Sequence, residues 1–422
     1  MVNGRVDARL RMPSDPSTTP FDSPALAHGK PIDVVRVITR LNIGGPSIQA
    51  TRLTNALDRD GFRTTLIHGR LGEGEGDMSY LIAPGSHAIH MPTLCRPLSP
   101  LDDLRTLFRL YGEIKRARPL IVHTHMAKAG LLGRLAAAAY NMMRGPAPRA
   151  RVVHTYHGHV LEGYFSPLMT SVFINLERML ARASDRIIAI SPAIERDLRD
   201  TFRIGRAEQY RIVPLGFDLS QFAAVDDRAR ALARQALQLP ADAEVVSTVG
   251  RLTAIKQHRL FLEAVRDAAK ARPQLIALIA GDGELRGELE AYARELGIAD
   301  RVRFLGWRRD LATIYAATNV FLLTSRNEGT PVALIEAMAS GVPGVSTDVG
   351  GVKDVIAADD LGARVPDGDS EALAAHIVQY LANPALARET GVRARAAVLG
   401  RYDIARLVND ILAVYRELLT VR

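Results

Sequence analysis

The chain has 422 residues, 47% of them hydrophobic and 24% charged, and a formal net charge of +8 at pH 7. This length favours two domains over one, and no apolar run approaches the roughly 18 residues that a membrane-spanning helix needs. Cys95 is the only cysteine, which excludes a disulfide within the chain and fits a reducing cytoplasm.

Residues 1–30 are rich in Pro, Ser, Thr and Asp and lack the continuous apolar core of a signal peptide, so we expect a disordered tail. A β-branched run at 32–41 then ends in "NIGGPS" and precedes a helical pattern, which is the order that opens a Rossmann-like unit. Further strand-like runs alternate with helices at 101–118, 127–143 and 167–183. This alternation predicts a parallel, doubly wound sheet.

The helix expected at 101–118 is amphipathic. One face is predicted to cover the core of the first domain, and its apolar residues are Leu101, Leu104, Leu107, Phe108, Tyr111 and Ile114. The same helix is rich in positive charge, and the alternative is that it makes a peripheral contact with anionic lipid. Its basic residues are Arg105, Arg109, Lys115, Arg116 and Arg118.

Positive charge gathers in the first half of the chain. Residues 31–214 carry 25 Lys and Arg against 16 Asp and Glu, whereas residues 215–422 carry 25 against 27. We therefore expect the first half to meet an anionic substrate or a membrane surface. Nucleic acid is not expected as a partner, because the basic residues are dispersed and no nucleic-acid motif accompanies them.

The second half repeats the pattern of the first. A strand at 244–252 is followed by an amphipathic helix, and "QLIALIAGDGE" again places glycines after a strand. Helices are expected at about 285–296, 310–317 and 331–340, and a linker near 215–243 separates the halves. Two such domains facing each other would form a cleft, because ligands of these sheets bind beyond the carboxyl ends of the strands.

Two glutamates stand eight positions apart in "NEGTPVALIEAMASG" (327–341). Thr330 and Pro331 are predicted to be the N-cap and first residue of a helix, whose free amides suit a phosphate. Glu328 precedes this helix start, and Glu336 lies inside the helix with its side chain leaning back toward the start. Both carboxylates can therefore approach one ligand, and they suit sugar hydroxyls better than phosphate.

Two cations, Arg251 and Lys256, lie in the turn "GRLTAIKQH" after a strand, and they suit a diphosphate. Histidines cluster at two other strand ends, which raises the alternative of a zinc site. No cysteine or carboxylate completes a ligand set at suitable spacing, so we expect no metal and no cofactor. The clustered histidines are His123, His125, His154, His157 and His159.

Several segments closely resemble the retaining family 4 glycosyltransferases of the GT-B fold: "LNIGGPS", "GRL…K", "AGDGE", "FLGW" and "SRNEGTPVALIEAMASGVPGVSTDVGG". The resemblance extends over about residues 32–400. "HTHMAKAGLLGRLAA" and "HTYHGHVLEGYF" resemble members that assemble bacterial polysaccharide and exopolysaccharide. The resemblance implies a metal-independent enzyme that moves a sugar, with retention, from a nucleotide diphosphate to a hydroxyl acceptor. UDP is the nucleotide it favours, and a glycan or lipid-linked intermediate is the acceptor.

The same resemblance implies a role for each site residue. Among the catalytic residues, Glu328 and His157 would face the transferred sugar, while Arg251 and Lys256 would neutralise the diphosphate. Glu336 would hold the ribose. The other residues implied for the donor are Gly44, Gly45, Gly281, Gly283, Phe304, Leu305, Gly329, Thr330 and Pro331. On the acceptor side, the predicted residues are His125 and Lys128.

We therefore expect an α/β protein with the GT-B fold, in the cytoplasm and near the inner face of the membrane. After the tail at 1–30, an acceptor-side Rossmann-like domain spans 31–215 and a nucleotide-sugar domain spans 216–402. A C-terminal helix at 403–422 crosses back to the first domain. Two alternatives stay open. A nucleotide-sugar epimerase shares this architecture but needs no acceptor, and a non-catalytic nucleotide-sugar-binding protein would be expected to lack a catalytic residue.

Overall fold

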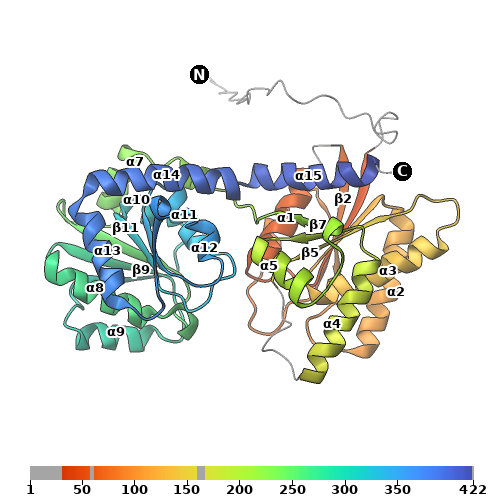
Figure 1. Ribbon diagram of the computed structural model, residues 1–422, viewed down its shortest axis with the longest axis horizontal. Helices are drawn as coiled ribbons and strands as arrows, with labels where there is room; N and C mark the ends of the chain where they lie inside the picture. The colour runs from red at the N-terminus through yellow and green to blue at the C-terminus, as the bar shows by residue number, and fades with distance from the viewer. Residues whose placement is uncertain (1–30, 58–60, 159–166, 421–422) are drawn as a thin grey trace, which may run out of the picture.

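The computed structural model describes residues 31–57, 61–158 and 167–420, so the expected tail at 1–30 and His159 lie outside the described residues. Two α/β domains lie side by side, and the last two helices run along one side of both (Figure 1). Each domain is built on one parallel sheet, as the alternation of strands and helices predicts.

The first domain contains a seven-stranded sheet in the order β3-β2-β1-β4-β5-β6-β7, with all neighbours parallel. Its central strands are buried on both faces, and polar residues such as Arg36, His123 and His154 are buried along with the apolar ones. The strands are β1 Ile32–Ile38, β2 Phe62–Gly69, β3 His87–Met91, β4 Ile121–His125, β5 Arg151–Tyr156, β6 Arg186–Ala189 and β7 Tyr210–Ile212. The helices are α1 Gly45–Leu57, α2 Pro100–Ala117, α3 Ala127–Met143, α4 Pro167–Arg182 and α5 Pro192–Arg196.

The second domain contains a six-stranded sheet in the order β10-β9-β8-β11-β12-β13, again with all neighbours parallel. Its strands are β8 Glu244–Val249, β9 Leu275–Ala280, β10 Val302–Gly306, β11 Val320–Leu323, β12 Gly344–Thr347 and β13 Gly362–Val365. Its helices are α8 His258–Ala271, α9 Arg286–Glu295, α10 Leu311–Ala317, α11 Val332–Ala339, α12 Val352–Val355, α13 Ser370–Ala382 and α14 Pro384–Tyr402.

The expected linker at 215–243 is largely folded, which corrects the prediction of a connecting segment. It contains α6 (Ser220–Ala223) and α7 (Asp227–Ala236), and the Asp226 side chain caps α7 by accepting from the Ala229 amide at 2.7 Å. Ala233 of α7 packs in a buried cluster with Ala316 and Ala317 at the end of α10. The segment therefore belongs to the second domain, because its apolar face is buried there.

The chain passes between the domains twice, and the two passages are joined by hydrogen bonds. Phe217 donates its amide to the Tyr402 carbonyl (2.8 Å), and Ile404 donates to the Phe217 carbonyl (2.9 Å). From there α15 (Ile404–Thr420) covers the first domain, where its buried side chains share a core with β1, β4 and α1. Glu417 near its end pairs with Arg186 of β6 at 2.6 Å.

The apolar face predicted for α2 is partly wrong. Leu110 and Ile114 are buried against α3 and the sheet, and Leu107 and Tyr111 pack on the same cluster. The other three residues assigned to this face point to solvent: Leu101 is 70% exposed, Leu104 52% and Phe108 67%. Helical periodicity allows two overlapping apolar stripes on such a helix, and packing against α3 decides which one is buried.

Candidate active site

Most of the predicted site residues lie in loops that follow strands near the point of each sheet where the strand order reverses. The strand order reverses between β1 and β4 in the first sheet and between β8 and β11 in the second. In doubly wound sheets, ligands bind at such reversal points, beyond the carboxyl ends of the strands. The structure thus brings together loops that lie far apart in the sequence, beginning at residues 39, 126, 250 and 324.

In the second domain, Lys256 and Glu328 form an ion pair. Lys256 Nζ lies 2.5 Å from Glu328 Oε1, and the same oxygen accepts from Ser325 Oγ at 2.6 Å. The side chains are 23% and 9% exposed, so the pair is largely sheltered yet open on one side. Ser325 was not predicted from the sequence, because a serine three residues before a glutamate has no distinctive pattern.

Hydrogen bonds to backbone carbonyls hold the loops after β8 and β11 together. Thr324 donates its hydroxyl to the Lys256 carbonyl (3.1 Å), and Arg326 donates its amide to the Ile255 carbonyl (2.8 Å). Lys256 also ends a short 3-10 turn, Ala254–Lys256. These contacts fix the backbone of Lys256, and the ion pair with Glu328 holds its ammonium, as a preorganised electrostatic site requires.

Arg251 is exposed beside this pair. Within the described part of the chain no carboxylate lies within ion-pair distance of its guanidinium, so the charge is available to an anionic ligand. Its carbonyl lies 3.1 Å from His258 Nε2, which ties the loop to the start of α8. Arg251 and Lys256 together place two cations after β8, in the arrangement expected for binding a diphosphate.

The glycines of "GDG" after β9 allow backbone to pack on backbone. A Cβ on Gly281 would lie 1.9 Å from the Gly250 carbonyl oxygen, and one on Gly283 would lie 2.5 Å from that of Leu252. These glycines therefore support the loop that carries Arg251, and a direct contact with a donor stays a prediction. Phe304 packs partly on the core of the second domain, and Leu305 lies at a register shift in β10.

Two glycines that sequence reasoning left without a role press against the Glu328 loop. Gly351 donates its amide to the Glu328 carbonyl at 2.8 Å, and a Cβ on Gly351 would lie 2.0 Å from the Gly329 oxygen. Gly350 has a positive φ of 48°, and its Cβ would lie 2.1 Å from the Glu328 oxygen. Both glycines belong to the "DVGG" of the segment that resembles the family, but only the structure shows what these glycines contact.

Gly351→Ala is therefore expected to displace the Glu328 loop while leaving the fold intact. A shift of about 1 Å in a catalytic group can cost about 10²-fold, so we expect kcat/KM to fall by that order. Transfer kinetics would measure the effect, with Gly287→Ala as the control, since a Cβ at Gly287 has nothing within 4 Å. Equal kinetics for the two variants would show that the glycine contact does not position Glu328.

Glu336 is held in an unusual protonation state by its surroundings. Burial raises the pKa of its carboxyl to about 7, although the hydroxyl of Tyr315, which donates to Oε2 at 3.0 Å, lowers this pKa. Tyr315 is fully buried and connects α10 to α11. The glutamate is thus partly protonated near neutral pH, and a ribose hydroxyl could either donate to it or accept from it.

This raised pKa predicts a pH-dependent stability. The folded state holds the proton more tightly than the unfolded state, so the free energy of unfolding should fall as pH rises from about 4.5 to 7, by on the order of 1–3 kcal/mol. Glu336→Gln should remove that fall, which denaturant titrations at pH 5 and 8 would show. Glu371→Gln, at an exposed position of α13, should keep it. Parallel pH curves for wild type and Glu336→Gln would contradict this prediction.

The helix after Glu328 begins one residue later than predicted. Pro331 occupies the N-cap position and α11 starts at Val332. Thr330 therefore stands one residue before the N-cap instead of at it. Ile335 donates its amide to the Pro331 carbonyl at 3.1 Å. Proline is tolerated there because its missing N–H would have had no partner within the helix.

In the first domain, Gly44 ends the turn after β1 and Gly45 is the first residue of α1. A Cβ on Gly45 would lie 2.8 Å from Leu215 Cδ1, so this glycine lets α1 begin close under the passage between the domains. Ile48 in the first turn of α1 packs on a buried cluster that extends to α11 of the second domain. The carboxyl edges of the two sheets are thus connected through this cluster.

His157, just after β5, contacts His125 at the end of β4. Its Nε2 lies 3.0 Å from Nδ1 of His125, and burial lowers the pKa of His157 to about 3. The ring is therefore neutral at pH 7. Nδ1 of His157 is buried and has no hydrogen-bond partner among the described residues. His125 is fully buried and its ring packs against that of His157, so its predicted acceptor contact stays a prediction.

A buried polar chain continues from His125 to the C-terminal helix. The rings of His125 and His123 stack with centroids 4.3 Å apart, and Nδ1 of His123 lies 2.7 Å from the hydroxyl of Tyr415. Arg36, which is fully buried, donates to that hydroxyl at 3.0 Å. Because arginine can only donate, the tyrosine is free to donate to His123, whose remaining proton then lies on Nε2 and points to Thr155 (2.7 Å).

Lys128, predicted on the acceptor side, contacts residues of its own domain. Its ammonium pairs with Asp103 of α2 at 2.7 Å and also donates to the Pro97 carbonyl. The side chain is 8% exposed, so an acceptor contact would require this pair to open. Lys128 therefore links the start of α3 to the start of α2.

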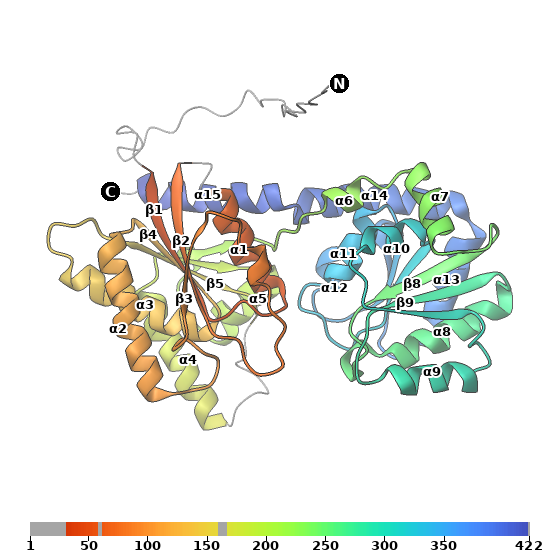
Figure 2. The same cartoon turned by 180° about the vertical axis from the view of Figure 1, so that it is seen from behind.

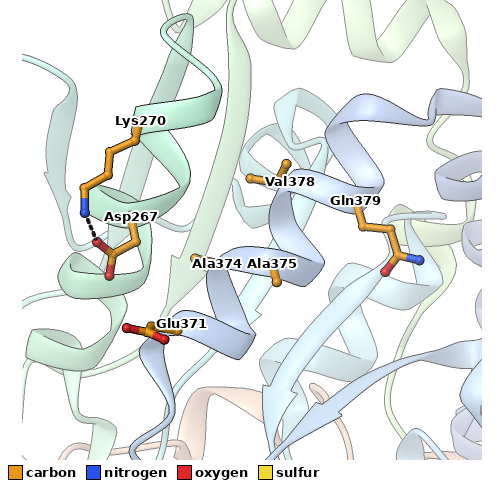
Figure 3. Close-up of a pocket in the computed structure, with 7 residues that line it drawn as sticks. All are labelled: Asp267, Lys270, Glu371, Ala374, Ala375, Val378 and Gln379. Atoms are coloured by element: carbon orange, nitrogen blue, oxygen red, sulfur yellow. Dashed lines mark hydrogen bonds and ion pairs between the residues drawn. The ribbon is translucent and has the colours of Figure 1, made fainter.

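Among residues 31–57, 61–158 and 167–420, no group of three His, Cys, Asp or Glu side chains is arranged to hold a metal ion. A surface hollow between α8 and α13 contains none of the predicted site residues (Figure 3). One wall carries the ion pair of Lys270 with Asp267, and the other is lined by Glu371, Ala374, Ala375, Val378 and Gln379. The hollow is separate from the loops described above.

Comparison with known proteins identifies the family. Residues 43–221 match the family described as Glycosyltransferase Family 4, and residues 229–397 match the one described as Glycosyl transferases group 1. A UDP-Gal:alpha-D-GlcNAc-diphosphoundecaprenol alpha-1,3-galactosyltransferase of Escherichia coli is 32% identical over 284 residues, covering 65% of this chain and 70% of the relative. The chain belongs to the family 4 glycosyltransferases.

Other relatives of this glycosyltransferase agree. The lipopolysaccharide core biosynthesis glycosyltransferase LpsE of Rhizobium meliloti is 31% identical over 222 residues, covering 53% of this chain and 61% of LpsE. A solved glycosyltransferase structure from Rickettsia africae has a TM-score of 0.78 at 18% identity, covering 93% of this chain and all of that one. HepE of Anabaena, solved with UDP, has a TM-score of 0.74 at 21% identity and covers 92% of this chain and all of that one. The GT-B fold expected from the sequence is confirmed.

Proposed function

We propose that this glycosyltransferase transfers a sugar, with retention and without a metal ion, from a UDP-sugar to a hydroxyl of a lipid-linked glycan in bacterial polysaccharide synthesis. The observation that carries the proposal is the pairing of Lys256 with Glu328 at the β8–β11 reversal point, beside the free Arg251. UDP is favoured because the E. coli relative is named for a UDP-galactose donor and a diphosphoundecaprenol-linked acceptor, and because HepE was solved with UDP.

The chemistry requires cations more than a carboxylate base, because an oxygen of the departing diphosphate can take the proton that the acceptor hydroxyl loses as it bonds to the sugar. Breaking the bond between sugar and phosphate builds negative charge on the departing diphosphate, and fixed cations stabilise that charge. Arg251 and Lys256 would meet the diphosphate, while Glu328 would shift from its lysine to a sugar hydroxyl. On the other side His157, neutral and with Nδ1 unpartnered, would accept from or donate to the sugar. Glu336 would hold the ribose.

Isothermal titration tests the donor site. Purified protein is titrated with UDP, GDP and ADP, first without metal and then with Mg²⁺, and the series is repeated on Arg251→Ala and Glu336→Ala. We expect UDP to bind without metal and both variants to weaken it. If no nucleotide binds to the wild type, the proposed donor is wrong.

Product analysis separates the proposal from an epimerase. With a UDP-sugar alone, a transferase releases little changed nucleotide sugar, whereas an epimerase converts the donor without any acceptor. NMR of the product formed with acceptor would then give the anomeric configuration, and an inverted product would overturn the retaining mechanism.

A further inference from the structure

The buried polar chain that joins His157 to Tyr415 lies on one face of the first sheet. His123 and His125 stand two positions apart on β4 and therefore point to the same side, and Thr155 of β5 pairs in register with His125. α15 packs on this face, whereas α3 packs on the other (Figure 2). These side chains thus lead from the C-terminal helix to the carboxyl edge of the sheet, where the site residues lie.

The ring of His125 is held between two other imidazoles. It stacks on His123 with ring centroids 4.3 Å apart, and its centroid lies 5.3 Å from that of His157. His123 is itself held at both nitrogens, by the hydroxyls of Tyr415 and Thr155, each at 2.7 Å. The ring plane of His125 is therefore fixed, and its Nδ1 is directed at Nε2 of His157, 3.0 Å away.

His125 and His157 have one proton between their facing nitrogens. Burial lowers the pKa of both rings, that of His157 to about 3, so each is neutral at pH 7 and carries a single proton. Only one of the two facing nitrogens can be the donor. Either His125 donates and His157 keeps its own proton on Nδ1, or His157 donates and His125 keeps its own proton on Nε2. The tautomer of one ring thus decides that of the other.

Burial decides between these two arrangements. Nε2 of His125 and Nδ1 of His157 are both buried without a hydrogen-bond partner among the described residues, and a buried N–H without a partner is costly. His125 is fully buried. His157 is only half-buried and precedes Gly158, which is exposed and has nothing within 4 Å of the place of a Cβ. The remaining N–H is therefore better placed on His157, where a substrate oxygen can become its partner.

We propose that His125 is a positioning residue, which donates its Nδ1–H to His157 and so keeps the proton of His157 on Nδ1. His157 then presents a donor, and it would give a hydrogen bond to an oxygen of the transferred sugar. The proposed function leaves open whether His157 donates or accepts, and the inference rests on that function for the identity of the partner. It also gives α15 a part in the site, because Tyr415 holds the ring on which His125 stacks.

NMR of the full chain with ¹⁵N-labelled histidine rings tests this proposal. The ¹⁵N shifts distinguish a protonated from an unprotonated ring nitrogen, and the spectrum of His157→Gln identifies the signals of His157. We expect the proton of His157 on Nδ1 in the wild type. His125→Leu should let this proton exchange between the two ring nitrogens. His125→Asn should keep the wild-type pattern, because its side-chain amide can replace Nδ1 as the donor.

The rate of transfer from a UDP-sugar gives a second measurement. His125→Leu should lower kcat by about 10–100-fold, the range known for the partners that orient metal-ligating histidines, and His125→Asn should recover most of that loss. The control is His154→Asn. His154 is equally buried on β5 but faces α3, where a Cβ on Gly130 would lie 2.5 Å from its Cε1. This variant should keep the wild-type tautomer of His157 and the wild-type rate.

Two results would overturn the proposal. One is a wild-type protein in which the proton of His157 lies on Nε2, and the other is a folded His125→Leu whose His157 signals match those of the wild type. Melting temperatures show which variants fold, and the wild-type spectrum decides the tautomer even if His125→Leu does not fold.

UDP titration of the same variants keeps this proposal distinct from the proposed function. Substitutions at His125 should leave UDP binding unchanged, because the residues proposed for the diphosphate and the ribose lie in the second domain. If the wild type binds no nucleotide, the donor assignment fails, and the spectrum still decides the tautomer. If UDP binds but the proton of His157 lies on Nε2, the proposed donor stands and the role of His125 is wrong.

Discussion

Lys256→Ala is expected to lower kcat by about 10²–10³-fold, the cost of removing one preorganised charge from a leaving-group site. The ammonium is fixed 2.5 Å from Glu328 and sheltered, with 23% of its side chain exposed, so water replaces it poorly. Lys256→Arg should not restore the rate, because a planar guanidinium cannot occupy the position of a compact ammonium. Transfer kinetics with the UDP-sugar varied would measure both variants.

The matched control is Lys270→Ala, which breaks an ion pair with Asp267 on the same domain but lies away from the site. It should leave kcat unchanged. Glu328→Gln should also lose about 10²-fold, and the double variant with Lys256→Ala should lose less than the product of the two, because the side chains contact each other. Wild-type turnover by Lys256→Ala would remove this pair from the catalytic site.

Tyr415→Ala is expected to lower the free energy of unfolding of the first domain by about 3–5 kcal/mol, the usual cost of truncating a large buried aromatic. The ring is fully buried on α15, and its centroid lies 5.8 Å from that of Phe62 on β2. Loss of the hydroxyl also leaves Arg36 and His123 without their shared partner. Denaturant unfolding would measure the change, and separate transitions for the two domains should be resolved.

Tyr415→Phe isolates the hydroxyl and should cost about 1–3 kcal/mol, because a buried arginine and a buried imidazole lose a hydrogen bond. Asn409→Ala, at an exposed position of the same helix, should change stability by less than about 0.5 kcal/mol. If Tyr415→Ala unfolds like the Asn409 control, α15 does not stabilise the first domain through this residue.

The sequence by itself indicated the two parallel sheets, most of the order of strands and helices, and the family, but the edge strands β3 and β13 were not predicted. These features are local: β-branched runs, glycine turns and helical periodicity extend over a few residues each, and short segments specify them. The loops that carry Arg251, Lys256, Glu328 and His157 could be found in the same way, because each follows directly after a strand or its turn.

Only the tertiary structure decided which of these residues meet. Lys256 and Glu328 lie 72 positions apart, and Tyr415 and His123 lie 292 apart, so no local pattern links them. Only the structure shows that His125 is buried and that Lys128 pairs with Asp103, and their acceptor role stays a prediction. The sequence of α2 permitted two overlapping apolar stripes, and the choice between them depended on α3, whose position is fixed by long-range packing.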